Sequence, residues 1–239
     1  MSDEIAHALG AIDAAAVQRE YWRQNEFVML RDCLPPALVA RMVAEVDAVR
    51  PAAHRSYIPR HKKGGSVSYH TLAGRAPAIL ALYRSPAFLA FLRGVTRAPV
   101  GECPEHDPHR CALYFYTEPG DHIGFHYDTS YYRGARYTVL VGLIERSSSR
   151  LLCQPYKRVP GHPPEELALR TEPGTLVLFN GNTLWHAITP LGDGEERVSL
   201  TMEYVTDGSM SPGKRFVSNM KDAIAYFGFS AVFRGARSR

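Results

Sequence analysis

The order of hydrophobic and polar positions divides the chain into a helical front half and a β-rich back half. Helices are predicted where apolar residues recur at three- and four-residue spacing, over residues 13–23, 38–49 and 76–95. The last of these is predicted to break near Ser85, because the residue before a proline disfavours helical geometry. Phe27–Leu30 is predicted to be a short strand, and the polar, basic segment 55–68 to be a long loop.

From residue 111 onward the sequence consists of short runs of β-branched and aromatic residues, which clusters of Gly, Pro and Asp separate. Five such runs are CALYFYT, RYTVLVGLI, RLLCQPYKR, GTLVLFN and RVSLTMEY. This pattern is typical of an all-β sandwich or barrel. Helices that precede such strands predict an α+β fold, in which N-terminal helices pack on one side of a β-core.

We expect a single domain over residues 1–239, because no linker or internal repeat interrupts the chain. Its parts are a helical region of about 1–105, a β-core of about 106–206 and a C-terminal extension of about 207–239. The extension is predicted to hold a helix at residues 218–227, followed by an extended tail.

Composition and charge exclude several classes of protein. The four cysteines are scattered without a CxxC pair, which argues against a structural zinc site or a secreted disulfide framework and favours the reducing cytoplasm. The N-terminus lacks the pattern of a signal peptide, and no stretch reaches the roughly 18 to 20 apolar residues of a membrane span. The net charge of +4 comes from dispersed Lys and Arg, so neither nucleic acid nor membrane is expected as a partner. The oligomeric state has no signature in the sequence.

Two histidines and an aspartate are the candidate metal ligands. His126 and Asp128 lie two residues apart in the β-rich half, so on a strand both side chains leave the same face. His186 supplies a second imidazole further along the chain. Two histidines and one carboxylate on one face of an octahedral metal leave other positions open, as in non-haem iron(II) oxygenases. An HxD pair alone is common by chance, so this interpretation depends on the residues that follow His186.

Arg197 and Ser199 form a candidate anchor for a dicarboxylate. Arg197 follows His186 by eleven residues and opens the predicted strand RVSLT. Because Arg197 and Ser199 share a strand face, a guanidinium and a hydroxyl are both available to one carboxylate. The turn PLGDG between them predicts that His186 and Arg197 lie on neighbouring antiparallel strands.

Together these motifs resemble the Fe(II)/2-oxoglutarate-dependent dioxygenase superfamily. The matching pieces are HYD at residues 126–128, GTLVLFNGNTLWHAITP around His186, and RVSL. They cover about residues 111–204 and, more weakly, the segment FVMLRDCLPP. The resemblance implies a double-stranded β-helix, or jelly-roll, core and the cofactors iron(II) and 2-oxoglutarate, with O2 as co-substrate. It assigns the metal to His126, Asp128 and His186, and 2-oxoglutarate to Arg197 and Ser199.

The resemblance also implies the class of reaction. Halogenases of this superfamily replace the carboxylate ligand by Gly or Ala so that chloride can coordinate the iron, whereas Asp128 is retained here. The chain is therefore expected to be an oxidoreductase that hydroxylates, or otherwise oxidises, an unactivated C–H bond of a small molecule. In relatives, a tyrosine about ten residues before the HxD pair often contacts 2-oxoglutarate. Tyr116 stands there, and a core position in a strand explains it equally well.

Several further residues are candidates for contact with the substrate. Thr201 and Glu203 continue the strand face of Arg197, and a buried carboxylate at Glu203 requires a cationic partner, which is either a substrate ammonium or guanidinium or an internal Arg. The segment after the HxD pair is expected to rim the metal pocket, and the basic loop at 55–68 to close over it as a lid. These segments add the remaining candidates, which are Tyr132, Arg133, Arg60 and His70.

A pocket in which Glu203 faces a cation and Arg133 or Arg60 faces a carboxylate would suit a free amino acid, and a natural-product intermediate is another candidate substrate. Alternatively, these charges are surface residues or internal ion pairs. Two other histidines, His106 and His109, are expected in a solvated loop.

Three other functions stay open. A nucleic-acid dealkylase of the same superfamily would carry a second Arg six residues after the first, where this chain has Glu203. A protein or peptide hydroxylase is the second alternative, because prolyl-hydroxylase-like domains share this arrangement of motifs. A non-catalytic jelly-roll binding protein is the third, although no member of the metal triad is missing.

Overall fold

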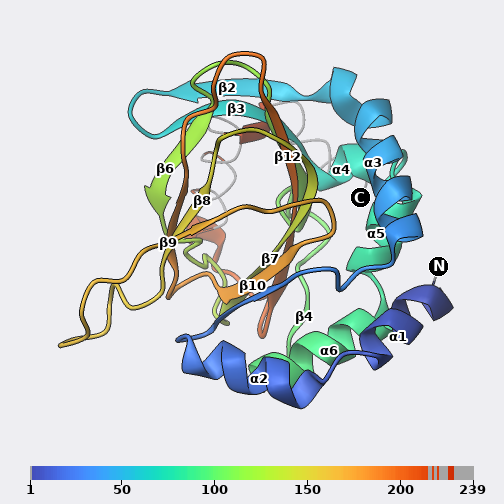
Figure 1. Ribbon diagram of the computed structural model, residues 1–239, viewed down its shortest axis with the longest axis vertical. Coiled ribbons are helices and arrows are strands. Elements are labelled where there is room, and N and C mark those ends of the chain that lie inside the picture. Colours follow the sequence, from blue (N-terminus) through green and yellow to red (C-terminus); the bar gives the residue numbers. More distant parts are fainter. Residues whose placement is uncertain (1, 215–216, 218–219, 221–225, 229–239) are drawn as a thin grey trace.

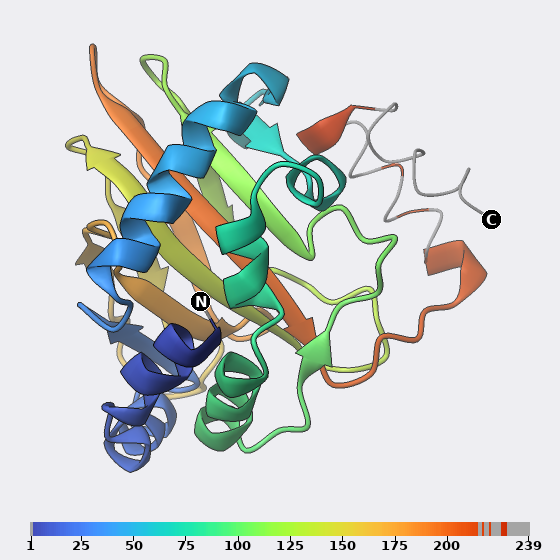
Figure 2. The same cartoon turned by 90° about the vertical axis from the view of Figure 1, so that its right-hand side faces the viewer.

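The computed structural model describes residues 2–214, 217, 220 and 226–228 of the chain. At its centre, antiparallel strands curl into a jelly roll around a cavity, and helices cover one side of it (Figure 1). Figure 2, turned by 90°, shows these helices lying across the outer surface of the sheet. The predicted α+β fold, a jelly-roll core with N-terminal helices on one side, is confirmed.

In the described residues, strands pair in the order β1-β10-β7-β12-β5-β3-β6-β11-β8-β9, with β2 beside β3 and β4 beside β12. The pairings are antiparallel, as expected for a jelly roll. The strand bounds are β1 Phe27–Leu30, β2 His54–Ile58, β3 Lys62–Val67, β4 Gly101–Glu102, β5 Cys111–Tyr116, β6 His122–His126, β7 Arg136–Arg146, β8 Leu151–Gln154, β9 Leu167–Leu169, β10 Leu176–Asn180, β11 Trp185–Ile188 and β12 Glu196–Val205.

Strand β3 joins the two layers of the jelly roll. Its residues Gly65 to Val67 pair with β5, whereas Lys62 and Lys63 pair with β6. One layer therefore holds β1, β10, β7, β12 and β5, and the other holds β6, β11, β8 and β9. Residues of both layers line the cavity, so it lies between them.

The helices cover the outer surface of the first layer. Their apolar side chains form one hydrophobic cluster with the outward side chains of β5, β7, β10 and β12. In α3, for example, Leu38, Met42 and Val46 are fully buried at helical spacing. Burying one such side chain stabilises the fold by about 1.5–3 kcal/mol. The helix bounds are α1 Ser2–Gly10, α2 Ala14–Arg23, α3 Pro36–Val49, α4 Tyr69–Leu72, α5 Pro77–Tyr83 and α6 Pro86–Thr96, with a 3-10 turn at Arg50–Ala52.

One face of strand β12 packs in the hydrophobic core, and its other face lines the cavity. Successive side chains of a strand point to opposite sides, so its residues divide into two sets. Val198, Leu200, Met202 and Tyr204 belong to the cluster beneath the helices. The alternate residues line the cavity, and these are Arg197, Ser199, Thr201 and Glu203.

Most predicted elements are confirmed. The helices predicted at 13–23 and 38–49 are α2 and α3, and the one predicted at 76–95 divides into α5 and α6, with Ser85 at the break. The loop predicted at 55–68 is wrong, because β2 and β3 form an antiparallel hairpin there. Basic and glycine residues are unusual in strands, so the sequence of this segment did not indicate them. One of these basic residues, Lys62, is buried. The helix predicted at 218–227 and its tail lie largely outside the described residues.

Among the described residues, no single helix has both the length and the apolar composition needed to cross a membrane. The pair α5 and α6 meets that test only when taken together, and it is bent by 41°.

Candidate active site

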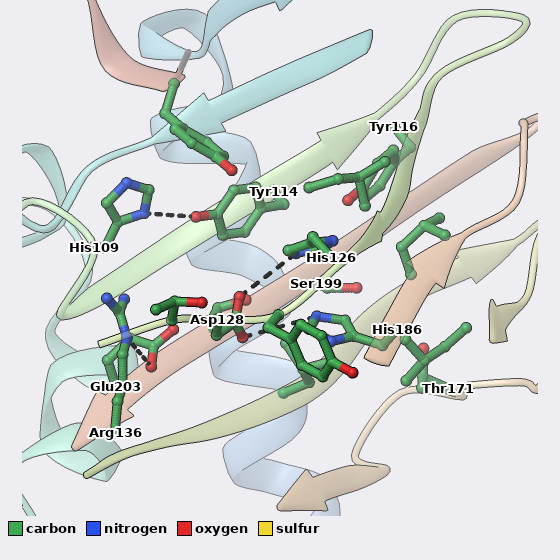
Figure 3. A pocket seen from close by; sticks show the side chains of 18 of the residues that line it. His109, Tyr114, Tyr116, His126, Asp128, Arg136, Thr171, His186, Ser199 and Glu203 are labelled. Carbon is green, nitrogen blue, oxygen red and sulfur yellow. Dashed lines mark hydrogen bonds and ion pairs between the residues drawn. The ribbon is translucent and has the colours of Figure 1, made fainter. Parts of the chain in front are cut away.

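Two histidines and an aspartate converge on the inner face of the second layer. His126 ends β6 and His186 lies in β11, and the register places these two residues opposite each other. His126 Nε2 is 3.5 Å from Asp128 Oδ1, and His186 Nε2 is 3.8 Å from Asp128 Oδ2. One ligand atom from each residue lies within 4.8 Å of the others, so two imidazoles and one carboxylate can hold one metal ion (Figure 3). This donor set fits iron(II) with open coordination positions.

Backbone carbonyls set the tautomer of both imidazoles. His126 Nδ1 is 2.8 Å from the carbonyl oxygen of Gly124, and His186 Nδ1 is 3.2 Å from that of Leu184. Because a carbonyl only accepts, each Nδ1 carries the hydrogen and each Nε2 keeps its lone pair for a metal. Burial, together with the neighbouring His126, lowers the pKa of His186 to about 4, so this imidazole is neutral at neutral pH.

The carboxylate of Asp128 is held from two sides. Thr138 Oγ1 lies 2.9 Å from Asp128 Oδ2. On the other side Gly181 approaches so closely that a Cβ there would lie 2.6 Å from the Asp128 carbonyl oxygen, so only glycine fits. Burial raises the pKa of Asp128, but the imidazoles of His186 and His126 lower it more, and the pKa lies below its ordinary value. The carboxylate is therefore ionised, as a metal ligand must be.

The three ligands line a cavity of about 290 Å³ that extends along the inner face of β12. Arg197 stands at one end of this face and Glu203 at the other. A strand advances about 3.3 Å per residue, so these positions lie roughly 20 Å apart. Figure 3 shows Glu203 on one side of the metal ligands and Thr171 on the other.

Arg197 is buried at its end of the cavity, with 1% of its surface exposed. Its Nη1 lies 3.0 Å from Glu145 Oε2, and its Nη2 donates to Thr171 Oγ1 at 2.8 Å. Thr171 comes this close because Gly142 has no side chain; a Cβ on Gly142 would lie 2.1 Å from the Thr171 carbonyl oxygen. The Nε–H of Arg197 is buried and has no hydrogen-bond acceptor in the described part of the chain.

This end of the cavity fits a carboxylate. A buried donor without an acceptor costs roughly 1–3 kcal/mol, and a carboxylate at Arg197 Nε would remove that cost. Ser199 lies on the same strand face, and Tyr116 lies directly opposite Arg197 on β5. Burial raises the pKa of Tyr116, so its hydroxyl keeps its hydrogen and can donate. The anchor and the metal ligands together fit 2-oxoglutarate, whose oxo-acid end chelates a metal while its distal carboxylate remains free.

Glu203 and Arg136 form an ion pair at the opposite end. Arg136 Nε donates to Glu203 Oε2 at 2.8 Å, and Thr138 Oγ1 lies 3.0 Å from the same oxygen. Of the two partners expected for Glu203, the structure therefore shows the internal Arg. Burial raises the pKa of Glu203 to about 7, although Arg136 opposes the shift. Within the described structure, Glu203 Oε1 and both terminal nitrogens of Arg136 make no hydrogen bond.

Aromatic side chains form the wall beside this ion pair. The Tyr114 hydroxyl is 2.8 Å from His109 Nδ1 (Figure 3), and the His109 ring meets Tyr226 edge-on at 4.6 Å. All three residues line the cavity. The expectation of a solvated His109 is wrong, since only 6% of its surface is exposed. Tyr226 lies outside every motif in the sequence, so no signal there indicated its position.

The structure brings most of the predicted site residues to one cavity. The eight that line it are His126, Asp128, His186, Arg197, Ser199, Tyr116, Glu203 and Thr201. Four others, Arg60, His70, Tyr132 and Arg133, are absent from the lining that the described residues form.

These four residues were predicted only because their segments were expected to lie near the cavity. Which side chain of a segment points into the cavity depends on the local backbone, and in two of these segments neighbouring residues do so instead. His61 lines the cavity in place of Arg60, which is exposed. Tyr131 and Arg136 line it in place of Tyr132 and Arg133, because the Tyr132 hydroxyl donates to Asp107 at 2.7 Å and Arg133 is exposed. The His70 ring instead packs against Tyr69.

The predicted pairing of the strands that carry His186 and Arg197 is wrong. β11 pairs with β6 and β8, whereas β12 pairs with β5, β7 and β4. The turn between them crosses from one layer to the other, so His186 and Arg197 approach the cavity from opposite layers. A short Gly-rich turn permits a hairpin, but it permits this crossing equally well.

Several solved structures are similar to this chain. SnoN, a non-heme, alpha-ketoglutarate-dependent epimerase from nogalamycin biosynthesis, is 14% identical with a TM-score of 0.67, over 81% of this chain and 82% of that one. It has also been solved with Fe3+, alpha-ketoglutarate and nogalamycin RO. A prolyl-4-hydroxylase of Pseudomonas putida is 18% identical with a TM-score of 0.62, over 81% and 98% of the two chains. A Trichoplax adhaerens prolyl hydroxylase, in complex with a peptide of hypoxia inducible factor, is 14% identical with a TM-score of 0.64, over 86% and 92%.

At these identities the solved structures establish the fold. No curated protein matches the sequence. The model of one family, Halogenase D, matches residues 11–134, which is more than half of the chain and includes His126 and Asp128. The chain therefore belongs to the halogenase D family, and its jelly-roll fold is that of the non-haem iron(II)- and 2-oxoglutarate-dependent dioxygenases.

Proposed function

We propose that this protein is an iron(II)- and 2-oxoglutarate-dependent oxygenase that hydroxylates a small molecule. The observation that carries the proposal is a single cavity that holds both the ligand set of His126, Asp128 and His186 and the buried Arg197. A jelly-roll protein that only bound ligands would need neither this set of metal-binding side chains nor a buried arginine Nε–H without an acceptor in the same cavity. The alpha-ketoglutarate dependence of SnoN supports the same cofactors.

Different side chains of the cavity would bind the metal and 2-oxoglutarate. When bound, iron(II), 2-oxoglutarate and O2 supply the oxidising chemistry. His126, His186 and Asp128 would hold the metal, with one ligand atom from each residue. Arg197 would donate to the distal carboxylate, and its Nη2 is held by a hydrogen bond to Thr171 Oγ1 at 2.8 Å. Because these groups are buried and already oriented, little reorganisation accompanies binding.

Hydroxylation is favoured over halogenation, although the family bears the name of a halogenase. In the halogenases of this superfamily, halide occupies the position that the carboxylate ligand leaves. Here Asp128 is present, and Thr138 and Gly181 hold it in place. The metal position that a halide would need is therefore filled by a protein ligand. Desaturation or ring closure remains the alternative outcome of the same C–H oxidation.

The size of the cavity favours a metabolite over a polymer. Sites for small molecules have volumes of about 300–1,000 Å³, and this cavity of about 290 Å³ also has to hold 2-oxoglutarate. The space left beside the metal suits a substrate of a few carbon atoms. A peptide hydroxylase is the second candidate, since two of the similar structures are prolyl hydroxylases. A nucleic-acid dealkylase gains no support, because Glu203, which lines the cavity, stands where such an enzyme carries its second Arg.

A free amino acid suits the charges at the substrate end. The ion pair of Arg136 and Glu203 presents a carboxylate oxygen and guanidinium nitrogens side by side, and these atoms make no hydrogen bond in the described structure. An α-ammonium on Glu203 Oε1 and an α-carboxylate on Arg136 would match them with charge-assisted hydrogen bonds. Arg136 thus takes the role that the sequence assigned to Arg133 or Arg60.

The cysteines indicate the cell compartment in which the protein works. All four cysteines are buried, and none is joined to another. Buried, unlinked thiols support a reducing compartment such as the cytoplasm.

The test is turnover against a panel of free amino acids. Purified protein with iron(II), 2-oxoglutarate and O2 is incubated with each amino acid, and mass spectrometry follows succinate and any product that gains one oxygen. We expect a few amino acids to raise succinate formation and to be hydroxylated, and His186→Ala to abolish both. If only proline-containing peptides do so, the amino-acid assignment is wrong while the oxygenase stands. If the protein binds neither iron(II) nor 2-oxoglutarate, the oxygenase itself is refuted.

A further inference from the structure

We infer that Thr138 is a positioning residue for the metal, because its hydroxyl holds the Asp128 carboxylate in the orientation in which it binds iron. The inference rests on the proposed function, since it concerns the same metal. Thr138 was not among the residues that the sequence indicated. It lies ten residues after Asp128, on β7, and it does not itself line the cavity.

The Asp128 carboxylate lies close to both imidazoles. Asp128 Oδ1 is 3.5 Å from His126 Nε2, and Oδ2 is 3.8 Å from His186 Nε2. Both imidazoles carry their hydrogen on Nδ1, which points to a backbone carbonyl. Neither Nε2 therefore donates to Asp128 when it serves as a metal ligand. The Thr138 hydroxyl, 2.9 Å from Oδ2, is then the side-chain donor that the described structure offers to this carboxylate.

Thr138 is itself fixed by its surroundings. Its side chain is fully buried, and its residue lies directly opposite Glu203 in the pairing of β7 with β12. The Thr138 hydroxyl is 3.0 Å from Glu203 Oε2, and that oxygen also accepts from Arg136 Nε at 2.8 Å. Because threonine is β-branched, its χ1 rotation is restricted as well. The hydroxyl is thus held by a strand pair and an ion pair rather than by a mobile loop.

The Thr138 hydroxyl lies within hydrogen-bond distance of two carboxylates, those of Asp128 and Glu203. A hydroxyl has a single hydrogen, and two carboxylate oxygens compete for it. Glu203 Oε2 already receives the N–H of Arg136, whereas Asp128 Oδ2 has no comparable donor. The Thr138 hydrogen therefore serves Asp128. Groups that bond to metal ligands in this way typically change metal affinity by about 10- to 100-fold when they are removed.

The consequence is that β7 and β12, through Thr138, set the orientation of a ligand that follows the end of β6. Asp128 itself lies in a segment without regular secondary structure, between β6 and β7. A carboxylate in such a segment is free to rotate unless another group restrains it. Thr138 supplies that restraint from one side, while the glycine backbone at position 181 limits the main chain from the other.

The test measures metal affinity, with Co(II) alone as the probe and its visible absorption as the signal. We expect Thr138→Val to weaken Co(II) binding by about 10- to 100-fold and to change the absorption bands, and Thr138→Ser to restore both. Thr138→Ala removes the hydroxyl without adding bulk, so it gives the same answer if the valine variant does not fold. Thr96→Val is the matched control, because Thr96 is also buried and donates to a carbonyl, at 2.8 Å, but lies in α6.

The outcomes separate the two claims. If wild-type protein binds Co(II) and His186→Ala does not, the metal site stands. If Thr138→Val and Thr138→Ala then bind Co(II) as tightly as wild type and with the same spectrum, the role of Thr138 is refuted. It is also refuted if Thr96→Val weakens binding equally, because the loss would then reflect general destabilisation. If wild type itself does not bind Co(II), the proposed function fails and this inference fails with it.

Discussion

Arg197 and Glu203 face one cavity from the same face of β12, six residues apart, with the candidate metal ligands between them (Figure 3). Each is already paired, Arg197 with Glu145 at 3.0 Å and Glu203 with Arg136 at 2.8 Å. Both charges are therefore held in place before a ligand arrives. In the proposed function, the Arg197 end of the strand would bind the distal carboxylate of 2-oxoglutarate and the Glu203 end would bind the substrate.

Arg197→Lys tests the anchor. Lysine keeps the charge that balances the buried Glu145 but loses the planar fork of the guanidinium. A hydrogen bond to a charged group is worth about 1.5–3 kcal/mol, so we expect 2-oxoglutarate to bind at least about tenfold more weakly. Anaerobic calorimetry of 2-oxoglutarate binding to the iron(II) protein measures this. Arg146→Lys is the control, since Arg146 pairs with Glu196 on the exposed surface. Equal affinity in Arg197→Lys and wild type would contradict the assignment of the anchor.

Two parts of the candidate site, the HxD pair and the pair of Arg197 and Ser199, were predictable from the sequence because each follows a short-range rule. His126 and Asp128 share a face through the two-residue period of a strand, and Arg197 and Ser199 do so as well. These relations hold within one segment. The pairing of β11 with β6, which brings His186 opposite His126, joins segments some 60 residues apart, and only the family resemblance pointed to it.

The substrate end was less predictable, for two physical reasons. Whether Arg133 or Arg136 enters the cavity depends on where irregular backbone ends and β7 begins, and element boundaries leave little trace in a sequence. Tyr226 and Gly181 reach the site through tertiary contacts that no local pattern encodes. The hairpin of β2 and β3 was missed because Lys62, although charged, is buried there and breaks the expected alternation of polar and apolar residues.

Asp128→Gly and wild-type protein, compared with and without chloride, test whether the reaction is hydroxylation or halogenation. Removing a metal ligand should weaken metal binding by more than the roughly 10- to 100-fold that a residue bonded to a ligand contributes, and hydroxylation should be lost. Wild-type protein is expected to form only oxygenated product when chloride is in excess, because Asp128 fills the position of a halide. Mass spectrometry of products formed with and without chloride provides the measurement. A chlorinated product from wild type would contradict the proposed reaction.

Glu203→Gln tests whether the Glu203 carboxylate binds the substrate. The variant keeps the shape of the side chain and removes the charge that is proposed to bind an ammonium group. We expect the KM for the amino-acid substrate to rise about tenfold or more, with little change in the KM for 2-oxoglutarate. Glu102→Gln is the matched control, because Glu102 also pairs with a buried arginine, Arg110, but does not line the cavity. If both variants behave alike, Glu203 serves the fold rather than the substrate.

Lys62 gives the protein a pH-dependent stability that can be measured without any cofactor. Burial lowers the pKa of Lys62 to about 7 from its ordinary value of 10.5. Between these two values the unfolded chain keeps a proton that the folded chain has lost, so the free energy of unfolding rises with pH. We expect wild type to gain up to about 1.4 kcal/mol per pH unit relative to Lys62→Met above pH 7. Urea denaturation at several pH values checks this, and parallel curves for the two proteins would show the shift to be absent.

If the proposed function holds, one cavity binds iron(II) and 2-oxoglutarate together. Anaerobic addition of 2-oxoglutarate to the iron(II)-loaded protein, while the visible spectrum is recorded, tests this. We predict a charge-transfer band that saturates at one 2-oxoglutarate per chain, is absent in His186→Ala, and requires more 2-oxoglutarate in Arg197→Lys. A protein that binds iron(II) but gives no band at any 2-oxoglutarate concentration, or gives the same band after His186→Ala, would contradict the assignment.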